Sequence, residues 1–338
     1  MKKEVIAIDI GGTHFRSCLF KSPEGIVSEP KREKTPSFLL YPELTIEELQ
    51  NKLIKKMVEV IRFYLSKDSS ISQVGISFPA PMTADGIVHQ ACTVWGERGF
   101  NFPLLEKLTE ECPSLSITVA NDITAAIERY AQMEEYAHHD FLGAITVSSG
   151  IGSKIYDVKS SKVLLDRRGL GGEMGHIRVD FSEDALLCDC GGKGHVGAIC
   201  SGRGIQRLAQ KKASVHPNYQ NSYLSKLVKN PEEITTYHII EALQQDDPFT
   251  TEILDETTFI LTGCISQLAA TIGVDKWVFI GGFALNCGQK YLDSLRRSIT
   301  KHDFYQRPRG EIPNMVSLGI NDDNDCLIGI GLLAERNN

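Results

Sequence analysis

The chain has 338 residues, 42% of them hydrophobic and 23% charged, with a formal net charge of −7. This length is enough for two domains with cores of their own. An acidic balance without a basic cluster argues against a nucleic-acid partner, and no apolar run reaches the length that crosses a bilayer. Nine cysteines without a recognisable signal peptide predict a reducing, cytoplasmic location.

The first predicted element is a hairpin with a bare tip. The apolar run 5–10 includes Asp9 near its end, and 15–20 is typical of a returning strand. Backbone amides and a hydroxyl at the tip could approach a phosphate, while Asp9 could hold a hydrated Mg²⁺. Glycine hairpins are usually ordinary turns, so this segment alone decides nothing. The tip residues are Gly11, Gly12 and Thr13.

Helical patterns alternate with the strands. Apolar residues at 49, 53, 54, 57, 61 and 65 share one helix face, and 253–272 predicts a second, longer helix. The polar stretch 211–233 is typical of a surface excursion. Strands alternating with such helices predict an α/β architecture.

A candidate catalytic carboxylate lies at a junction of strand and helix. Asn121 and Asp122 follow the apolar strand 115–119 and precede the helical run 125–130. Such strand ends face clefts in α/β folds. Asp122 could also be a simple helix cap, which this segment taken alone favours. Only the motifs elsewhere in the chain favour catalysis.

A second small-residue hairpin follows at 141–158, and a third apolar strand, 277–280, also ends in glycines. Neither a Walker sequence nor a dinucleotide fingerprint is present in the chain, so phosphate binding would depend on these hairpins. Lys154 could reach a phosphate, but a solvated lysine is the usual case. The candidate phosphate-binding residues here are Ser149, Gly150, Gly152, Gly281 and Gly282.

Four residues of metal-binding types, two cysteines and two histidines, gather within twenty positions. Two cysteines and two histidines meet the ligand count of a closed zinc site, and the glycines at 191, 192 and 194 allow the tight turns that it needs. Buried free thiols and a surface histidine are the alternative. Cys200 is a reserve ligand. The predicted ligands are His176, Cys188, Cys190 and His195.

The order and spacing of these motifs resemble the ROK family of sugar kinases and repressors over nearly the whole chain. Repressors of that family carry a DNA-binding segment before the kinase-like part, whereas the first hairpin here begins within ten residues of Met1, which disfavours a repressor. The segments that carry the resemblance are 9–13, 75–81, 121–122, 150–152, 173–176, 188–191, 201–202, 281–282 and 318–331.

The resemblance implies an actin-like ATPase (ribonuclease H-like) fold, with two α/β domains and an active-site cleft between them. We expect a small domain over 1–121, a large one over 122–325 and a final helix, 326–338, that packs back on the small domain. It also implies Asp122 as general base, and Asn121, Glu173 and His176 as ligands of the sugar hydroxyls. ATP, Mg²⁺ and Zn²⁺ are the implied cofactors, and a homodimer is the implied assembly.

Two positions depart from the family pattern within the predicted zinc loop. His195 stands where a third cysteine is usual, and Gly197 stands where a glutamate reads the anomeric end of the sugar. Imidazole can replace thiolate on zinc, but glycine cannot replace the hydrogen bond, which is worth orders of magnitude in discrimination. Cys92 also replaces a sugar-contacting asparagine of many relatives. Glucose is therefore in doubt as the substrate.

The sequence thus predicts an ATP-dependent kinase that phosphorylates a hydroxyl of a hexose or of a hexose-like small molecule, with a structural zinc shaping the substrate loop. An amino sugar or a cyclitol, which lacks an anomeric centre, is the alternative substrate. A sugar sensor derived from a kinase is the competing class of protein, although a sensor does not need a general base.

Overall fold

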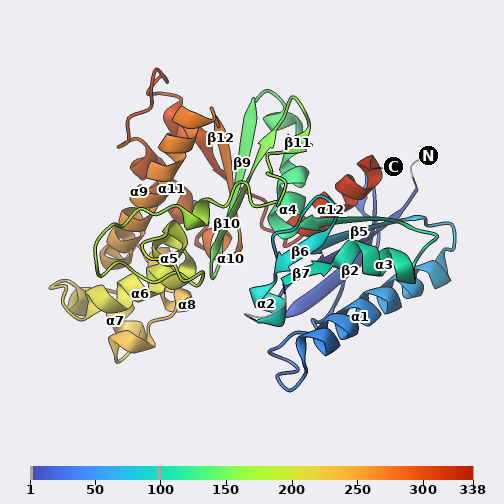
Figure 1. The fold of residues 1–338 in the computed structure, drawn as a ribbon. Helices are drawn as coiled ribbons and strands as arrows, with labels where there is room; N and C mark the ends of the chain where they lie inside the picture. The colour runs from blue at the N-terminus through green and yellow to red at the C-terminus, as the bar shows by residue number, and fades with distance from the viewer. Residues whose placement is uncertain (1–2, 97–99, 338) are drawn as a thin grey trace. The chain divides into compact units, whose positions relative to one another are not determined.

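The structure, a computed structural model, describes residues 3–96 and 100–337, and it divides into two compact units (Figure 1). The first consists of Met1–Ala137, Val163–Gly171 and Asp322–Asn338, and the second of His138–Lys162 and Gly172–Asn321. The break therefore follows residue 137 and not residue 121. Helix α4, which begins at Asp122, stays with the first unit because it packs against the C-terminal helix α12.

A six-stranded sheet forms the centre of the first unit, in the order β3-β2-β1-β5-β8 with β4 paired to β2. Strand β1 is antiparallel to β2 and parallel to β5, which in turn is parallel to β8. Strands β6 and β7 form a separate antiparallel pair. The elements are β1 (Val5–Ile10), β2 (His14–Lys21), β3 (Gly25–Ile26), β4 (Lys31–Lys34), α1 (Ile46–Lys67), β5 (Gln73–Phe78), β6 (Ile87–Gln90), α2 (Cys92–Trp95), β7 (Phe100–Pro103), α3 (Leu104–Glu111), β8 (Ser116–Asn121), α4 (Asp122–Ala131) and α12 (Asp325–Arg336).

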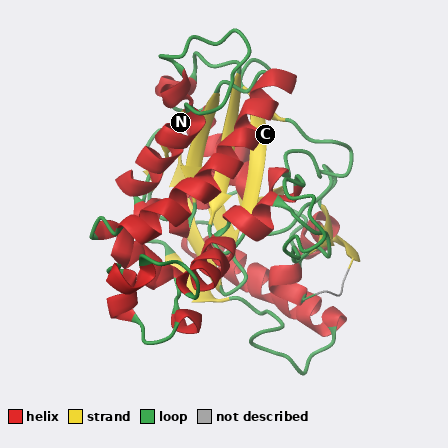
Figure 2. Cartoon of the chain, turned by 90° about the vertical axis from the view of Figure 1, so that its left-hand side faces the viewer, coloured by secondary structure: helices red, strands yellow, loops and turns green. Residues whose placement is uncertain are grey.

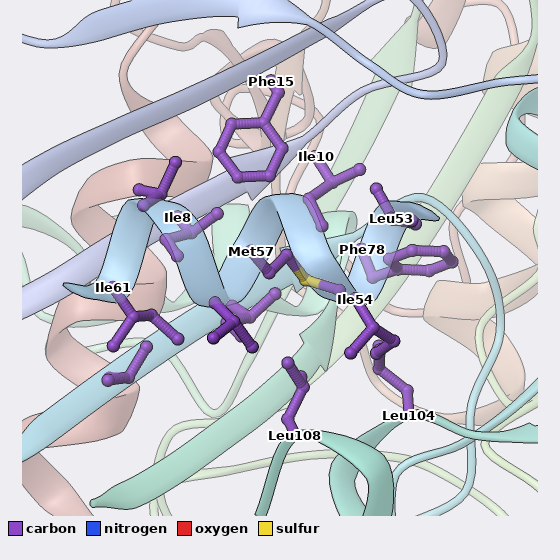
Figure 3. Packing of buried hydrophobic residues seen from close by; sticks show 14 of the residues in the cluster. Ile8, Ile10, Phe15, Leu53, Ile54, Met57, Ile61, Phe78, Leu104 and Leu108 are labelled. Atoms are coloured by element: carbon purple, nitrogen blue, oxygen red, sulfur yellow. The ribbon is translucent and has the colours of Figure 1, made fainter. Parts of the chain in front are cut away.

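Helix α1 covers one face of this sheet. Its start is fixed by a capping box, in which the Thr45 hydroxyl accepts from the Glu48 amide and the Glu48 carboxylate accepts from the Thr45 amide. Figure 3 shows its apolar face, with Met57 at the centre, packed among side chains such as Ile8 and Phe78. The helix predicted from the apolar spacing is therefore present, and its stripe forms the larger core of the unit.

Helix α12 covers the other face at very short range. A side chain at Gly75 of β5 would place its Cβ 2.5 Å from the carbonyl oxygen of Ile330 in α12, and one at Gly329 would place its Cβ 1.7 Å from the Ala125 oxygen in α4. Ala7 of β1 is fully buried on this side. Small residues thus let three backbone segments meet, which explains the glycines of the C-terminal helix.

The second unit is built on a five-stranded sheet in the order β11-β10-β9-β12-β13. Strand β9 is antiparallel to β10 and parallel to β12, and β12 is parallel to β13. Figure 2 looks toward this unit and shows helices lying in front of strands. The elements are β9 (Phe141–Val147), β10 (Ile151–Asp157), β11 (Lys162–Val163), α5 (Val196–Cys200), α6 (Gly202–Ala213), α7 (Leu224–Leu227), α8 (Thr236–Gln244), α9 (Pro248–Thr271), β12 (Lys276–Ile280), α10 (Gly282–Cys287), α11 (Gln289–Ile299) and β13 (Val316–Leu318).

Both units repeat one strand pattern. In each, an antiparallel hairpin carries parallel strands on the far side of its first strand. The two hairpins predicted from glycine-rich turns are β1–β2 and β9–β10, and the strand predicted before Gly281 is β12. Helix α9 begins at Pro248, capped by Asp247, rather than at residue 253. Among the described residues no helix has the length and apolar character needed to span a membrane.

A buried polar cluster joins α12 to α4. The Arg129 guanidinium contacts Asp322 at 2.7 Å and Asp325 at 2.9 Å, and the Tyr130 hydroxyl donates to Asp325 at 2.7 Å. Burial raises the pKa of the Asp325 carboxyl to about 6, despite these donors. Glu128, at the same end of α4, pairs with Arg336. The two helices are thus joined by charges as well as by apolar contacts.

Gly329→Ala tests the close approach of α12 to α4. We expect this substitution to lower the free energy of unfolding by about 2–4 kcal/mol, because the added methyl group overlaps the Ala125 carbonyl and the helices must separate. Gly310→Ala is the matched control, since a Cβ there meets nothing within 4 Å. Urea denaturation of both variants measures the effect, and equal stability of the two variants would contradict the packing.

Asp325→Asn tests the buried carboxyl. The native pKa of about 6 lies above the ordinary value of 3.8, so the native state holds this proton more tightly, and the resulting stability is present below pH 4 and lost as the pH rises through 6. We expect the wild type to lose roughly 2–3 kcal/mol relative to the asparagine variant between pH 4 and 7. Urea denaturation across this range measures the difference, and a constant difference would refute the assignment.

Candidate functional site

Asp9 of β1 is held by two side chains of its own sheet. The Arg16 guanidinium, opposite it on β2, lies 2.6 Å from Oδ2, and the Ser77 hydroxyl donates to Oδ1 at 2.9 Å. Arg16 also contacts the Asp323 carboxylate at 2.7 Å. These partners fix the carboxylate of Asp9, whose role toward a hydrated Mg²⁺ stays a prediction.

The tip of the first hairpin is a tight turn. The Gly11 amide donates to the His14 carbonyl at 2.8 Å, and the Thr35 hydroxyl donates to the Gly11 carbonyl at 2.7 Å. A Cβ at Gly12 would lie 2.8 Å from the Thr93 oxygen. Thr13 is exposed. The predicted residues therefore share one turn. Packing alone favours glycine at positions 11 and 12, whether or not a ligand binds there.

Asn121, and not Asp122, is the N-cap of α4. Its Oδ1 accepts from the amides of Ile123 and Thr124 at 3.0 and 3.3 Å. Its amide group donates to the Ala80 carbonyl at 3.2 Å and to Asp122 Oδ1 at 2.8 Å. The cap thus leaves Asp122 as the first helical residue, oriented by Asn121 and half-buried. A substrate hydroxyl would have to replace one of the Asn121 bonds.

The second hairpin gathers most of the other predicted phosphate-binding residues. The Gly282 amide donates to the Ser148 hydroxyl at 2.9 Å, and the Gly202 amide donates to the Ser148 carbonyl at 2.8 Å. Gly281 has φ +91, and a Cβ there would lie 2.4 Å from the Thr146 hydroxyl. The hairpin tip, the end of β12 and the start of α6 therefore meet, with Ser149 and Gly150 in the turn between β9 and β10.

Arg203 connects this hairpin to the predicted zinc loop. Its guanidinium donates to the Ser149 carbonyl at 2.8 Å and pairs with Asp189, which lies between the two cysteines of the loop. A cavity of about 110 Å³ opens beside it, lined in part by Gly150, His176 and Gly197. The sequence did not single out Arg203, because its partners are distant along the chain.

The expectation that Lys154 is solvated is wrong. Its side chain is 0% exposed, and Nζ lies 2.6 Å from Oε1 of Glu173. A buried ammonium requires such a partner, since an unpaired charge in the interior costs several kcal/mol. Glu173, predicted to bind a sugar hydroxyl, is 25% exposed. No local pattern distinguishes this lysine from a solvated one, because the pairing connects β10 with the segment that precedes the 3₁₀ turn Met174–His176.

The four predicted metal ligands converge, with their ligand atoms all within 4.8 Å of one another. Cys188 Sγ lies 4.0 Å from His176 Nδ1, and Cys190 Sγ lies 3.3 Å from His195 Nδ1. Tetrahedral zinc with nitrogen and sulfur ligands places ligand atoms roughly 3.3–3.8 Å apart. The donor set and its spacing therefore fit a closed zinc site without further residues.

The reserve ligand Cys200 lies elsewhere. It is buried in α5, its thiol donates to the Thr257 carbonyl at 3.2 Å, and burial raises its pKa well above the ordinary value. A thiol that resists ionisation is a poor zinc ligand. The glycines of the loop agree with the predicted tight turns, since Gly191 and Gly194 both have positive φ. His195 thus completes the group in place of a third cysteine.

The sequence matches the ROK family over residues 5–337. The chain belongs to the ROK family. A C(7)-cyclitol 7-kinase of Streptomyces hygroscopicus subsp. limoneus is 35% identical over 337 residues, which cover 98% of this chain and 93% of that protein. A 2-epi-5-epi-valiolone 7-kinase of an Actinoplanes species is 30% identical over 218 residues, covering 63% of this chain and 58% of that protein. The chain is thus a phosphotransferase of the sugar-kinase class.

A solved structure of a ROK family protein has the same fold. A crystal structure of a ROK family glucokinase from Streptomyces griseus, in complex with glucose and AMPPNP, superposes with a TM-score of 0.76 at 24% identity, covering 99% of this chain and 100% of that chain. This likeness confirms the predicted actin-like ATPase fold. Gly197, the residue that departs from the ROK pattern, lies in α5. A Cβ added at Gly197 would be 3.1 Å from the carbonyl oxygen of Gly175.

Replacing one thiolate tests the zinc site. We expect the purified protein to hold about one zinc per chain, and Cys190→Ser to weaken zinc binding by at least about 100-fold, because a neutral hydroxyl replaces a thiolate ligand. Metal content by mass spectrometry and the melting temperature with a chelator measure both effects. Cys92→Ser is the control, since this exposed thiol lies outside the cluster. Equal zinc in both variants would refute the assignment.

Proposed function

We propose that this ROK family enzyme transfers the γ-phosphoryl group of ATP to a hydroxyl of a C7 cyclitol. The observation that carries the proposal is Gly197, which lines the cavity beside His176 without a carboxylate where ROK sugar kinases read the anomeric end. A carbocyclic ring has no anomeric hydroxyl, so the missing carboxylate at position 197 removes no contact to such a substrate. The full-length likeness to C(7)-cyclitol 7-kinases supports the same substrate class.

Asp122 is the proposed general base. It accepts the proton of the attacking hydroxyl as the new oxygen–phosphorus bond forms, while the bond from the γ-phosphorus to the β-phosphate oxygen breaks and ADP leaves. A loose transition state of this kind depends on alignment more than on covalent chemistry. The amide of Asn121 and the Ile123 N–H both bond Asp122 Oδ1, so the carboxylate is already oriented before substrate binds.

The glycine hairpins are the proposed ATP site. Around the second hairpin, Ser149, Gly150, Gly152, Gly281 and Gly282 lie in or beside turns that bring no bulky side chain near a phosphate. A phosphate that bound the Gly282 N–H would replace its bond to the Ser148 hydroxyl. At the first hairpin, Gly11, Gly12 and Thr13 would contact the phosphates, and Asp9 would hold a hydrated Mg²⁺. Mg²⁺, when bound, would neutralise phosphate charge there. The AMPPNP bound by the Streptomyces griseus glucokinase supports ATP as the donor.

Glu173 and His176 are the proposed ligands of the substrate hydroxyls. Both lie in the segment that leads into the zinc loop, and His176 also belongs to the metal cluster. With four protein ligands a zinc ion has no open position, so it would fix the loop rather than activate water. The loop then presents Glu173 and the Gly197 cavity in one arrangement.

A hexose is the second candidate substrate, supported by a glucokinase of Thermotoga maritima that is 25% identical over 304 residues. An ADP-release assay with ATP and Mg²⁺ separates the candidates. The panel contains 2-epi-5-epi-valiolone, glucose, mannose and the N-acetylated amino sugars. Preference for the cyclitol supports the proposal, and preference for a hexose refutes it. Ligand-induced thermal stabilisation without turnover on any compound would instead favour a sensor.

Asp122→Asn tests the base. We expect kcat to fall by about 100- to 10,000-fold, with the KM values of substrate and ATP within about threefold of wild type, because the amide keeps the shape of the carboxylate but cannot accept the proton. Asp303→Asn, at an exposed aspartate of the second unit, should leave kcat unchanged. Wild-type turnover in Asp122→Asn would show that another group removes the proton.

A further inference from the structure

Arg16 lies between two carboxylates, and only one of them faces solvent. Its Nη2 contacts Asp9 Oδ2 at 2.6 Å, and its Nη1 contacts Asp323 Oδ2 at 2.7 Å. The side chains of Arg16 and Asp9 are 16% and 10% exposed, whereas that of Asp323 is 77% exposed. Ion pairs that are shielded from solvent are screened much less than surface pairs. The contact to Asp9 is therefore the less screened of the two.

The contacts of Asp9 leave little of its carboxylate free. Arg16 Nε also donates to Oδ2, at 3.2 Å, and the Ser77 hydroxyl donates to Oδ1 at 2.9 Å. An ionised carboxylate has about four acceptor positions. Arg16 takes the two on Oδ2, and Ser77 takes one on Oδ1. A cation could thus bind both oxygens of Asp9 only by displacing the guanidinium, and a single position on Oδ1 remains for another partner.

The charge of Arg16 acts in the same direction. It neutralises the charge of Asp9, so a divalent cation gains little by direct contact with this carboxylate. Mg²⁺ gives up its water ligands reluctantly and usually keeps several of them. Both effects favour a contact in which a water molecule of the hydrated ion donates to the remaining position on Asp9 Oδ1.

The guanidinium of Arg16 is held from its other side by the turn 322–325. The carbonyl of Asp323 accepts from Arg16, as does its carboxylate. Two other carboxylates of this turn contact Arg129 of α4, and α4 begins with Asp122. The turn therefore links the hairpin that carries Arg16 to the helix that carries the proposed base.

We propose that Arg16 is a positioning residue for phosphoryl transfer, which keeps Asp9 in contact with Mg²⁺ only through water. It does so by occupying Oδ2 and by neutralising the carboxylate, while the turn 322–325 fixes the guanidinium. The phosphate oxygens of ATP then meet no competition from Asp9 for direct contact with the metal. This inference rests on the proposed function, since it assumes that Asp9 faces the hydrated Mg²⁺ of the ATP site.

Arg16→Met tests the proposal without turnover, because it removes the charge and the donors but keeps an extended side chain. Mn²⁺ is the probe, and its binding to the purified protein without nucleotide is titrated by electron paramagnetic resonance. We expect the variant to bind Mn²⁺ at least about tenfold more tightly than the wild type, because the freed carboxylate attracts the cation directly. Arg16→Lys, which keeps the charge, should stay within about threefold of the wild type.

The same variant is then tested for activity with Mg²⁺ and ATP in the ADP-release assay. We expect kcat of Arg16→Met to fall by at least about tenfold, because a metal in direct contact with Asp9 is misplaced for the phosphates. The KM for the acceptor substrate should stay within about twofold of the wild type, since Arg16 acts on the metal and not on the acceptor. A purely structural role of Arg16 would lower kcat without tightening Mn²⁺ binding.

Arg32→Met is the matched control. Arg32 is exposed on β4 directly opposite Arg16, so this variant removes the same charge from the same sheet. Its Mn²⁺ binding should stay within about twofold of the wild type. Unchanged or weaker Mn²⁺ binding in Arg16→Met overturns the proposal, and equal tightening in Arg32→Met does so as well, because it shows a general effect of net charge.

Arg16→Gln, which keeps an uncharged donor, is made in case the methionine variant does not fold, and it should tighten Mn²⁺ binding in the same way. Failure of both variants to fold shows that Arg16 is required for structure alone and overturns the proposal. If the wild type phosphorylates no acceptor of the panel, the proposed function fails separately. The Mn²⁺ titration needs no acceptor, so it still decides the role of Arg16.

Discussion

The first unit depends on the ion pairs that Arg129 makes with Asp322 and Asp325. This guanidinium lies at the C-terminal end of α4 and contacts the buried carboxylate of Asp325 and the more exposed carboxylate of Asp322. Leaving a buried charge without its partner costs far more than breaking a surface pair. The opposite end of the same helix begins with Asp122. The last residues of the chain therefore support the helix that carries the proposed base, although they lie some two hundred positions away.

The second unit also contains a buried cation, the ammonium of Lys154, which is paired with Glu173. An apolar residue at position 154 of β10 would avoid the desolvation cost of a buried charge. The buried ammonium is explained once Glu173 is included, because the strand then fixes a carboxylate that would otherwise sample many rotamers. A cost in stability is thus exchanged for a defined position of one oxygen atom.

Local features of the sequence predicted most of the fold and part of the site. The hairpins at Gly11 and Gly150 and the cluster of two cysteines and two histidines were predictable because each is complete within a short stretch of chain. The cap at Asn121 and the pairing of Lys154 were not, since two capping residues stood side by side and the partner of the lysine lay in another element. Cys200 was proposed as a ligand only because it is near the other ligands in sequence. Helix α5 instead directs its thiol toward Thr257 of α9.

The departures from the ROK pattern have one physical direction. His195 stands where a thiolate is usual and Gly197 stands where a carboxylate is usual. Both changes take negative charge or acceptor capacity away from the same loop. A site that binds a polyol recognises each hydroxyl through an acceptor placed against it, and an unmatched buried acceptor is costly. The loop would therefore lack the acceptor that contacts an anomeric hydroxyl, which is the difference that the proposed cyclitol substrate requires, while Asn121 and Asp122 keep the ROK pattern.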